Sequence, residues 1–219
     1  RARSALKQCP TKSARLIGIL RLIAGELEPA AELLGTAPGL GWSSEDHPGH
    51  LLFPAFMWLL DGAPSGSLRG GLALAIDRPP ATDFYSFEVD DRDDDAGYGQ
   101  PEKPRLSTPS LVQVMQQAAV SKGLTEQDRV IMRAALRAAA TARVDGVLRE
   151  KRRRHYEHAA TLVGYCVDLD DAAIGAIGSD WVAALRQRTS RFPAFQEALR
   201  QALARVKTSA TAEMTSSSK

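Results

Sequence analysis

The residues best suited to chemistry form a basic run at positions 149–154. Its bases are Arg149, Lys151, Arg152, Arg153 and Arg154. Arg holds phosphate oxygens through two parallel hydrogen bonds, whereas Lys acts as a point charge. A stripe of bases upstream would extend the same surface: Arg129, Arg133 and Arg137. This pattern favours a solvated face whose charges pair with Glu150, Glu157 or an acidic loop. The alternative is a nucleic-acid-binding surface on a helix.

Arg152 is the most informative base of this run. Leu148 and His155 lie seven residues apart on an apolar face that Ala159, Leu162, Cys166 and Leu169 continue at helical spacing. If one helix runs through the whole segment, Arg152 falls on that face. It must then pair with an acid, meet an anionic partner or extend its head group into solvent.

The four histidines stand in two His-x-x-His pairs, His47 with His50 and His155 with His158. On a helix this spacing presents both imidazoles to one metal ion, and two such pairs would complete a site if the fold brought them together. Glu157 or a neighbouring acid would serve as a ligand or orient a ligating ring. The positions of the residues favour the other interpretation, in which His47 caps the following helix and His155 is a packed core histidine.

Residues 83–102 carry eight acids and one Arg. Four of the acids occupy positions 1, 3, 5 and 12 of a frame similar to an EF-hand, a set of oxygen ligands suited to calcium: Asp91, Asp93, Asp95 and Glu102. Position 6 is Ala96 rather than Gly, and Pro101 and Pro104 prevent the usual exiting helix. These departures favour an acidic loop that neutralises the basic run over a calcium site.

No nucleophile elbow, phosphate loop, dinucleotide fingerprint or metalloprotease motif occurs. We therefore predict no catalytic residue and no cofactor, unless the histidines and Glu157 converge in one pocket. The two cysteines fit a reducing compartment, and no run reaches the roughly 18 apolar residues of a membrane helix. These features predict a cytoplasmic protein without membrane contact. The chain starts at Arg1 rather than Met, so we expect a piece of a longer polypeptide.

Ala, Leu and Arg dominate the composition and aromatic residues make up only 6%, which favours helix over sheet. We predict an all-α fold of helical-repeat-like or bundled antiparallel helices with a long irregular acidic insertion. The expected parts are an N-terminal helical segment, an irregular Gly/Pro-rich insertion, C-terminal helical hairpins and a disordered tail, at residues 1–61, 62–109, 110–207 and 208–219. The three tryptophans are expected to be core anchors.

Local signals place several helices. The run 51–60 is apolar on nearly all sides and predicts a buried central helix that is regular from Pro54. Thr125, with Asp128 three residues on, predicts the start of a long helix. Its predicted apolar face holds Ile131, Ala135, Ala138 and Ala142, and Asp145-Gly146 is expected to kink or end it.

Two stretches resemble known helical repeats. Residues 25–34, Gly-Glu-Leu-Glu-Pro-Ala-Ala-Glu-Leu-Leu, resemble the second half of a tetratricopeptide unit, in which a glycine packs on the neighbouring helix and alanines allow close approach. Pro29 would open that helix. Residues 156–160 and 181–195 resemble the terminal helical hairpins of bacterial proteins related to SWIM-type zinc-finger proteins. The zinc motif of that family is absent here, so the resemblance implies a scaffold and not a metal site.

Together these features predict a helical scaffold or protein-interaction module, part of a larger bacterial protein or complex. Its partner would be another protein or the remainder of the polypeptide. The alternatives are a nucleic-acid-binding module that uses the basic helix, and a metal-binding or enzymatic domain that uses the His-x-x-His pairs.

Overall fold

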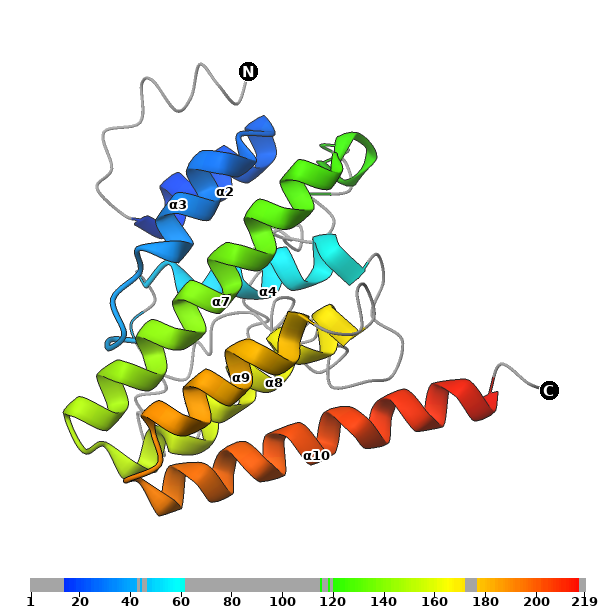
Figure 1. The fold of residues 1–219 in the computed structure, drawn as a ribbon. Helices are drawn as coiled ribbons and strands as arrows, with labels where there is room; N and C mark the ends of the chain where they lie inside the picture. Colours follow the sequence, from blue (N-terminus) through cyan, green and yellow to red (C-terminus); the bar gives the residue numbers. More distant parts are fainter. Residues whose placement is uncertain are drawn as a thin grey trace, which may run out of the picture.

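The computed structural model describes residues 14–42, 44, 47–61, 115, 118, 120–171 and 177–216. Within these residues the chain forms seven α-helices, two short 3-10 helices and no strand, which confirms the all-α prediction. Figure 1 shows the long helix α7 (Glu126–Arg149) running across the molecule between the N-terminal and the C-terminal helices. The predicted insertion at 62–109 lies outside the described residues.

The first two helices, α2 (Ala14–Ala24) and α3 (Leu27–Gly35), are joined by a tight turn. Gly25 adopts a left-handed φ of 73°, and the N–H groups of Gly25 and Glu26 donate to the carbonyls of Leu22 and Arg21. A Cβ on Gly25 would meet no atom within 4 Å, so this glycine makes the turn and does not pack on a neighbour, unlike the predicted tetratricopeptide glycine. The helix opens at Leu27, two residues before the expected start.

Helix α4 (Gly49–Asp61) is the predicted central helix and packs against α2, α3 and α7. Its Phe53 and Phe56 are fully buried. The prediction of a regular start at Pro54 is wrong, because the helix begins at Gly49 and Pro54 lies inside it. The earlier start is stabilised where the Leu52 N–H donates to the Pro48 carbonyl at 3.0 Å.

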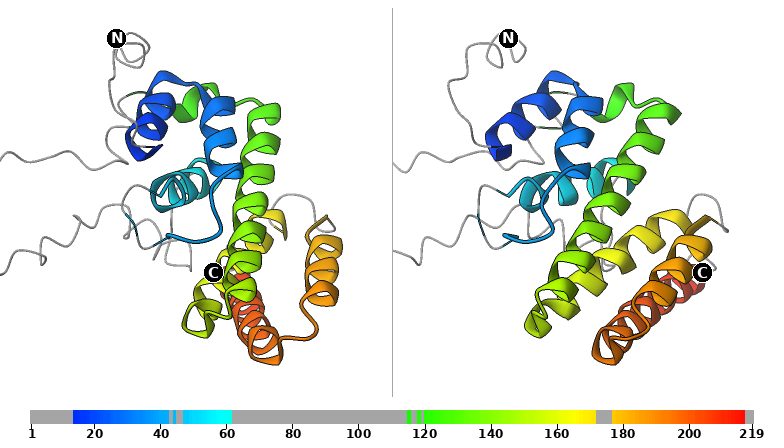
Figure 2. Two further views of the ribbon diagram at one scale, coloured as in Figure 1. Left: turned by 90° about the vertical axis from the view of Figure 1, so that its left-hand side faces the viewer. Right: turned by 60° about the vertical axis from the view of Figure 1, so that its left-hand side comes forward.

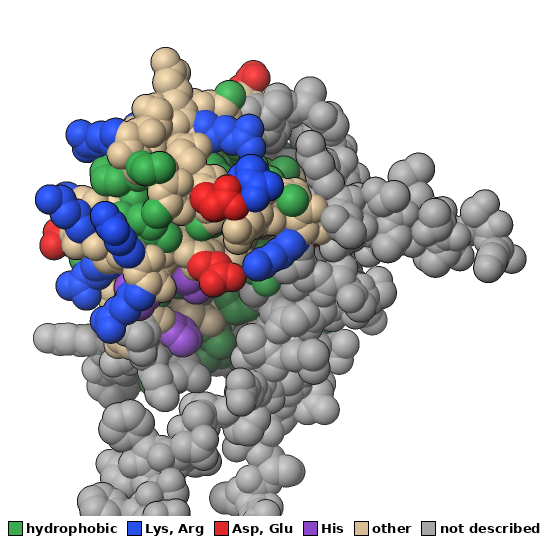
Figure 3. Space-filling model, turned by 90° about the horizontal axis from the view of Figure 1, so that it is seen from below, with side chains coloured by type: hydrophobic (Ala, Val, Ile, Leu, Met, Phe, Trp, Pro, Cys, Tyr) green, Lys and Arg blue, Asp and Glu red, His purple; other side chains and the backbone are tan. Residues whose placement is uncertain are grey.

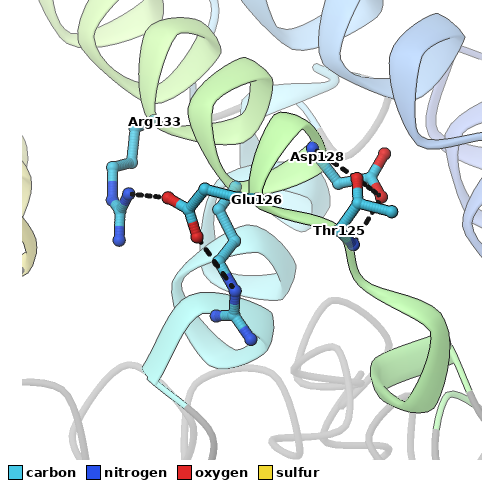
Figure 4. Close-up of polar contacts among 5 residues, drawn as sticks. Thr125, Glu126, Asp128 and Arg133 are labelled. Atoms are coloured by element: carbon cyan, nitrogen blue, oxygen red, sulfur yellow. Dashed lines mark hydrogen bonds and ion pairs between the residues drawn. The ribbon is translucent and has the colours of Figure 1, made fainter.

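Helix α7 follows a short 3-10 helix, η2 (Val120–Gly123), and starts at the predicted cap. The Asp128 N–H donates to Thr125 Oγ1 at 3.1 Å, and the Thr125 N–H donates to Asp128 Oδ2 at 2.8 Å (Figure 4). The helix continues through Gly146 to Arg149, so the predicted break at Asp145-Gly146 is wrong. Its buried face is also rotated from the predicted one, because Ala138 is exposed. The buried positions include Met132, Leu136, Ala139, Arg143 and Val147.

The C-terminal part consists of a 3-10 helix, η3 (Arg153–His155), and the helices α8 (Tyr156–Asp171), α9 (Ile177–Arg188) and α10 (Pro193–Ser216). Figure 2 shows α8, α9 and α10 gathered at one end of α7. Gly164 of α8 would place a Cβ 3.5 Å from Ala202 Cβ of α10, so these two helices approach closely. Helix α10 extends to Ser216, past the predicted start of a disordered tail at residue 208, because no Gly or Pro interrupts it after Pro193.

One hydrophobic core joins the two halves of the described chain. It contains Phe53 and Phe56 from α4, Leu136 from α7, Val163 from α8 and Phe195 from α10. The N-terminal and C-terminal helical segments predicted from the sequence therefore share a core, and α7 contributes to both sides of it.

Candidate anion-binding corner

The basic run sits where α7 ends, not on a continuous helix. The Arg152 N–H donates to the Val147 carbonyl at 2.8 Å, and the Lys151 N–H donates to the Leu148 carbonyl at 3.1 Å. This pair of bonds closes a Schellman motif, with Lys151 at a left-handed φ of 52°. Because the helix ends here, Arg152 does not reach the apolar face. It is exposed, and the prediction that it lies on that face is wrong.

The five bases of this segment form a surface that we call the cationic corner: Arg149, Lys151, Arg152, Arg153 and Arg154. All five are exposed. Within the described residues, the ion pair found in the corner joins Arg149 to its neighbour Glu150 at 3.5 Å. Glu157, the other predicted local partner, instead pairs with Arg205 of α10 at 3.4 Å. The corner therefore keeps most of its positive charge.

The upstream arginines lie on α7 before the corner and contact other residues of the fold. Glu126 pairs with both Arg129 at 3.9 Å and Arg133 at 3.5 Å (Figure 4). Arg137 lies over the ring of Trp181, 5.9 Å from its centroid. Arg133 is also about 24 Å along the helix axis from Arg149. These three arginines therefore have partners of their own within the fold.

His47 serves as a structural cap. It is buried, its Nε2–H donates to the Pro38 carbonyl at 2.8 Å, and its Nδ1 accepts from the Gly49 N–H at 3.1 Å. These partners require a neutral ring with the proton on Nε2. Burial is the main cause that lowers the pKa of His47, followed by the nearby bases. The alternative prediction that His47 caps the helix opening is confirmed, and both of its nitrogens are occupied.

The two His-x-x-His pairs do come together, around Trp42. The buried indole ring lies 4.8 Å from the His47 ring and 5.4 Å from the His158 ring, between centroids. His158 lies within electrostatic range of His47, His50 and His155, and Figure 3 shows histidines beside Lys and Arg on this face. Desolvation, and then the charge of Arg143, lowers the pKa of His158 to about 4, although the residue as a whole is exposed.

These rings are not arranged for metal binding or catalysis. Among the described residues, no group of three or more His, Cys, Asp or Glu side chains is placed to hold a metal ion. His155 Nε2 accepts from Arg154 Nε at 3.1 Å, and Glu157 is directed to Arg205 rather than to a ring. The predicted calcium ligands Asp91, Asp93, Asp95 and Glu102 lie outside the described residues.

Sequence reasoning missed Arg143, which is only 4% exposed on the inner face of α7. Its Nη1 donates to the Gly39 carbonyl at 3.1 Å, while its Nε is buried and has no hydrogen-bond partner. Burial, and then the charge of Arg152, lowers the pKa of Arg143, and no carboxylate of the described residues opposes these effects. The signal was present in the spacing of Met132, Leu136, Arg143 and Val147, which places Arg143 on the buried stripe.

No family model, no curated protein and no solved structure matches this chain. In the part of the chain that the structure describes, no helix has both the length and the apolar character needed to cross a membrane.

Proposed function

We propose that the protein is a helical interaction module that binds a nucleic acid through the phosphate backbone, using the cationic corner. The observation that carries this proposal is the unbalanced charge of the corner. Lys151, Arg152, Arg153 and Arg154 are exposed and consecutive, and no carboxylate of the described residues forms an ion pair with them. Four of the five bases of the corner are arginines, whose planar head groups match phosphate oxygens bidentately.

The surroundings of the corner favour backbone contacts over base recognition. Among the described residues, Tyr156, which follows the corner in the chain, is buried and therefore does not offer a stacking platform. Contacts to phosphate position a protein on nucleic acid but carry no sequence information. We expect binding with little sequence preference, and a log–log dependence of affinity on salt of about −0.9 per phosphate neutralised on duplex DNA.

The test is fluorescence anisotropy with labelled duplex DNA and duplex RNA across a salt series. The combined variant Arg152→Ala, Arg153→Ala, Arg154→Ala should lose most of the affinity and flatten the salt dependence. The matched Arg-to-Lys triple variant keeps the charge and measures what the guanidinium geometry adds. Arg200→Ala is the remote control, because Arg200 is exposed on α10 and pairs with Glu197. Unchanged affinity in the Ala triple variant would contradict the proposal, as would equal binding of polyglutamate.

A second candidate function is a helical scaffold or protein-interaction module within a larger protein. It is supported by the stacking of successive helices, with α2 on α3, α3 on α7, α7 on α8 and α8 on α10. Each element buries a stripe against the next, as stacked helical arrays do. The test is the assembly state of the full gene product by light scattering. A complex of fixed stoichiometry that persists in the Ala triple variant supports this function, and a lone monomer contradicts it.

A further inference from the structure

We infer that Arg143 and His158, with Arg152 at the outer edge, form a binding site for one phosphate-like dianion. The chemical class is inorganic phosphate or a phosphate monoester. The site lies inward of the cationic corner, between α7, η3, the first turn of α8 and the segment that carries Trp42 and His47. It goes beyond the proposed function, because backbone binding needs only the exposed bases of the corner.

The first observation is a buried cation for which the described residues provide no counter-charge. Arg143 is almost fully buried, and its observed acceptor is one backbone carbonyl, that of Gly39. Its Nε–H has no acceptor. Buried arginines are normally paired with acids, because an uncompensated buried charge destabilises a fold strongly. An anion at Arg143 would supply the missing charge and accept the unused hydrogen bonds.

The second observation is the sign of the neighbouring groups. Among the described residues, the titratable groups close enough to influence Arg143 and His158 are all bases, namely Arg152, His155, His50 and the neutral ring of His47. The nearest acid of α8, Glu157, is held away by Arg205. The Nε1–H of Trp42, whose ring contacts that of His158, is also buried without an acceptor. A cluster of one sign, with two unused N–H donors, is complementary to an anion.

The third observation is the position of His158 in the first turn of α8. The N-terminal end of a helix carries partial positive charge and favours an anion, although the first N–H of α8, that of Tyr156, already donates to the Arg153 carbonyl of η3. A titratable base at this position is disfavoured in its charged form unless an anion lies beside it. The N-terminal end of α8, Arg143 and Arg152 thus all contribute positive charge to the same region.

The number of fixed charges points to a dianion. Arg143 and Arg152 are both cations, so a carboxylate would balance one of them and a phosphate monoester would balance both. A phosphate monoester carries about −1.5 to −2 charge at pH 7, whereas an internal phosphodiester carries one. The site is therefore matched to inorganic phosphate or to a terminal phosphate group, and the two sources are separated by the ligands used below.

The experiment is isothermal titration calorimetry on the full chain at constant ionic strength, with inorganic phosphate as the first ligand. Oligonucleotides with and without a 5′-phosphate are the second pair of ligands. Arg152→Ala and His158→Gln should each weaken phosphate binding about tenfold, as expected for one charged hydrogen bond. Arg153→Ala is the matched control, because Arg153 does not contribute to the charges acting on Arg143. Arg143→Gln is added if its circular dichroism shows a folded protein.

Several outcomes decide the inference. The inference is overturned if the parent protein does not bind phosphate. It is also overturned if Arg153→Ala and His158→Gln lose phosphate affinity equally, because that would indicate an adventitious ion only, attracted by the general positive charge of the surface. Tighter binding of the 5′-phosphorylated oligonucleotide than of its 5′-hydroxyl twin assigns a terminal phosphate, and binding of inorganic phosphate alone assigns the free ion. The combined variant Arg153→Ala, Arg154→Ala should lose duplex binding and keep phosphate binding, so failure of either proposal is recognised separately.

Proton uptake gives a second readout. A bound dianion should favour protonation of His158 against the opposing charge of Arg143. At mildly acidic pH the heat of phosphate binding varies with the ionisation heat of the buffer, and part of this variation comes from phosphate itself, which also titrates near neutral pH. The number of protons taken up on binding should therefore be larger for the parent protein than for His158→Gln, and equal numbers for the two proteins contradict the role of this ring.

Discussion

Gly39 and Gly146 lie backbone against backbone, and this contact fixes Arg143 beside the segment that carries Trp42 and His47. A Cβ on Gly146 would lie 2.9 Å from the carbonyl carbon of Gly39. A Cβ on Gly39 would collide with the carbonyl oxygen of Ala142. The two glycines let the loop after α3 approach α7 closely enough for the Gly39 carbonyl to accept from Arg143.

This contact predicts that Gly39→Ala and Gly146→Ala both destabilise the protein. Because the colliding atoms belong to the backbone, the added methyl cannot be absorbed by a rotamer change, and a loss of about 1–3 kcal/mol is expected. Urea unfolding followed by circular dichroism measures the loss. Gly123→Ala is the matched control, since a Cβ there meets no atom within 4 Å. Equal stability of all three variants would show that the close approach is not real.

Lys151 offers a test of the helix end. It adopts a left-handed backbone conformation with φ 52°, which costs a residue with a side chain about 1–2 kcal/mol, whereas glycine adopts it freely. Lys151→Gly and Lys151→Ala remove the same charge from the corner. After allowance for the larger chain entropy of glycine in the unfolded state, Lys151→Gly should still be more stable by roughly 1 kcal/mol in thermal or urea unfolding. The opposite order would mean that α7 continues past Arg149.

The helices were predictable because their signals are local. Thr125 and Asp128 mark the start of α7 by a cap that needs only neighbouring residues. The apolar run 51–60 identifies the central helix α4 in the same way. The end of α7 was not predictable on this basis. A glycine inside a helix usually weakens it, so Gly146 looked like a helix end. Its contact with the distant Gly39, which requires a residue without a side chain, cannot be read from local sequence. Lys151 carries no sequence signal for a left-handed turn.

The candidate site was predictable only in part, for the same reason. The composition of the basic run identified the exposed corner, and the spacing of the two His-x-x-His pairs identified the rings. Which bases remain unpaired depends on tertiary partners, such as Glu157 with Arg205. Arg143 was not predictable, because the sequence does not show which group accepts hydrogen bonds from an arginine on an apolar stripe. The acceptor, the Gly39 carbonyl, is known only from the fold.

The capping box of α7 predicts a stability effect at its opposite end. Thr125→Ala removes the acceptor for the Asp128 N–H and should destabilise the protein by about 1 kcal/mol. The hydrogen bonds from the Thr125 side chain and backbone hold the pKa of Asp128 below its usual value. Their contribution to the free energy of unfolding is therefore lost as the pH falls through that lowered pKa. Gln127→Ala in the same exposed turn is the control. Chemical unfolding at pH 7 should separate the two variants, and identical midpoints would contradict the cap.

His158 predicts a stability loss on acidification. Its pKa is about 4 in the folded protein and near 6.5 in a free side chain, so between these values the unfolded chain binds more protons at this ring. The stability contributed by the neutral ring is present above pH 6.5 and is lost as the pH falls toward 4. Urea unfolding of the parent protein and of His158→Gln, at a series of pH values, should give a smaller loss in the variant. Added inorganic phosphate should reduce the loss in the parent protein alone, because a bound dianion favours the protonated ring. Parallel curves for both proteins would place the acid sensitivity at another group.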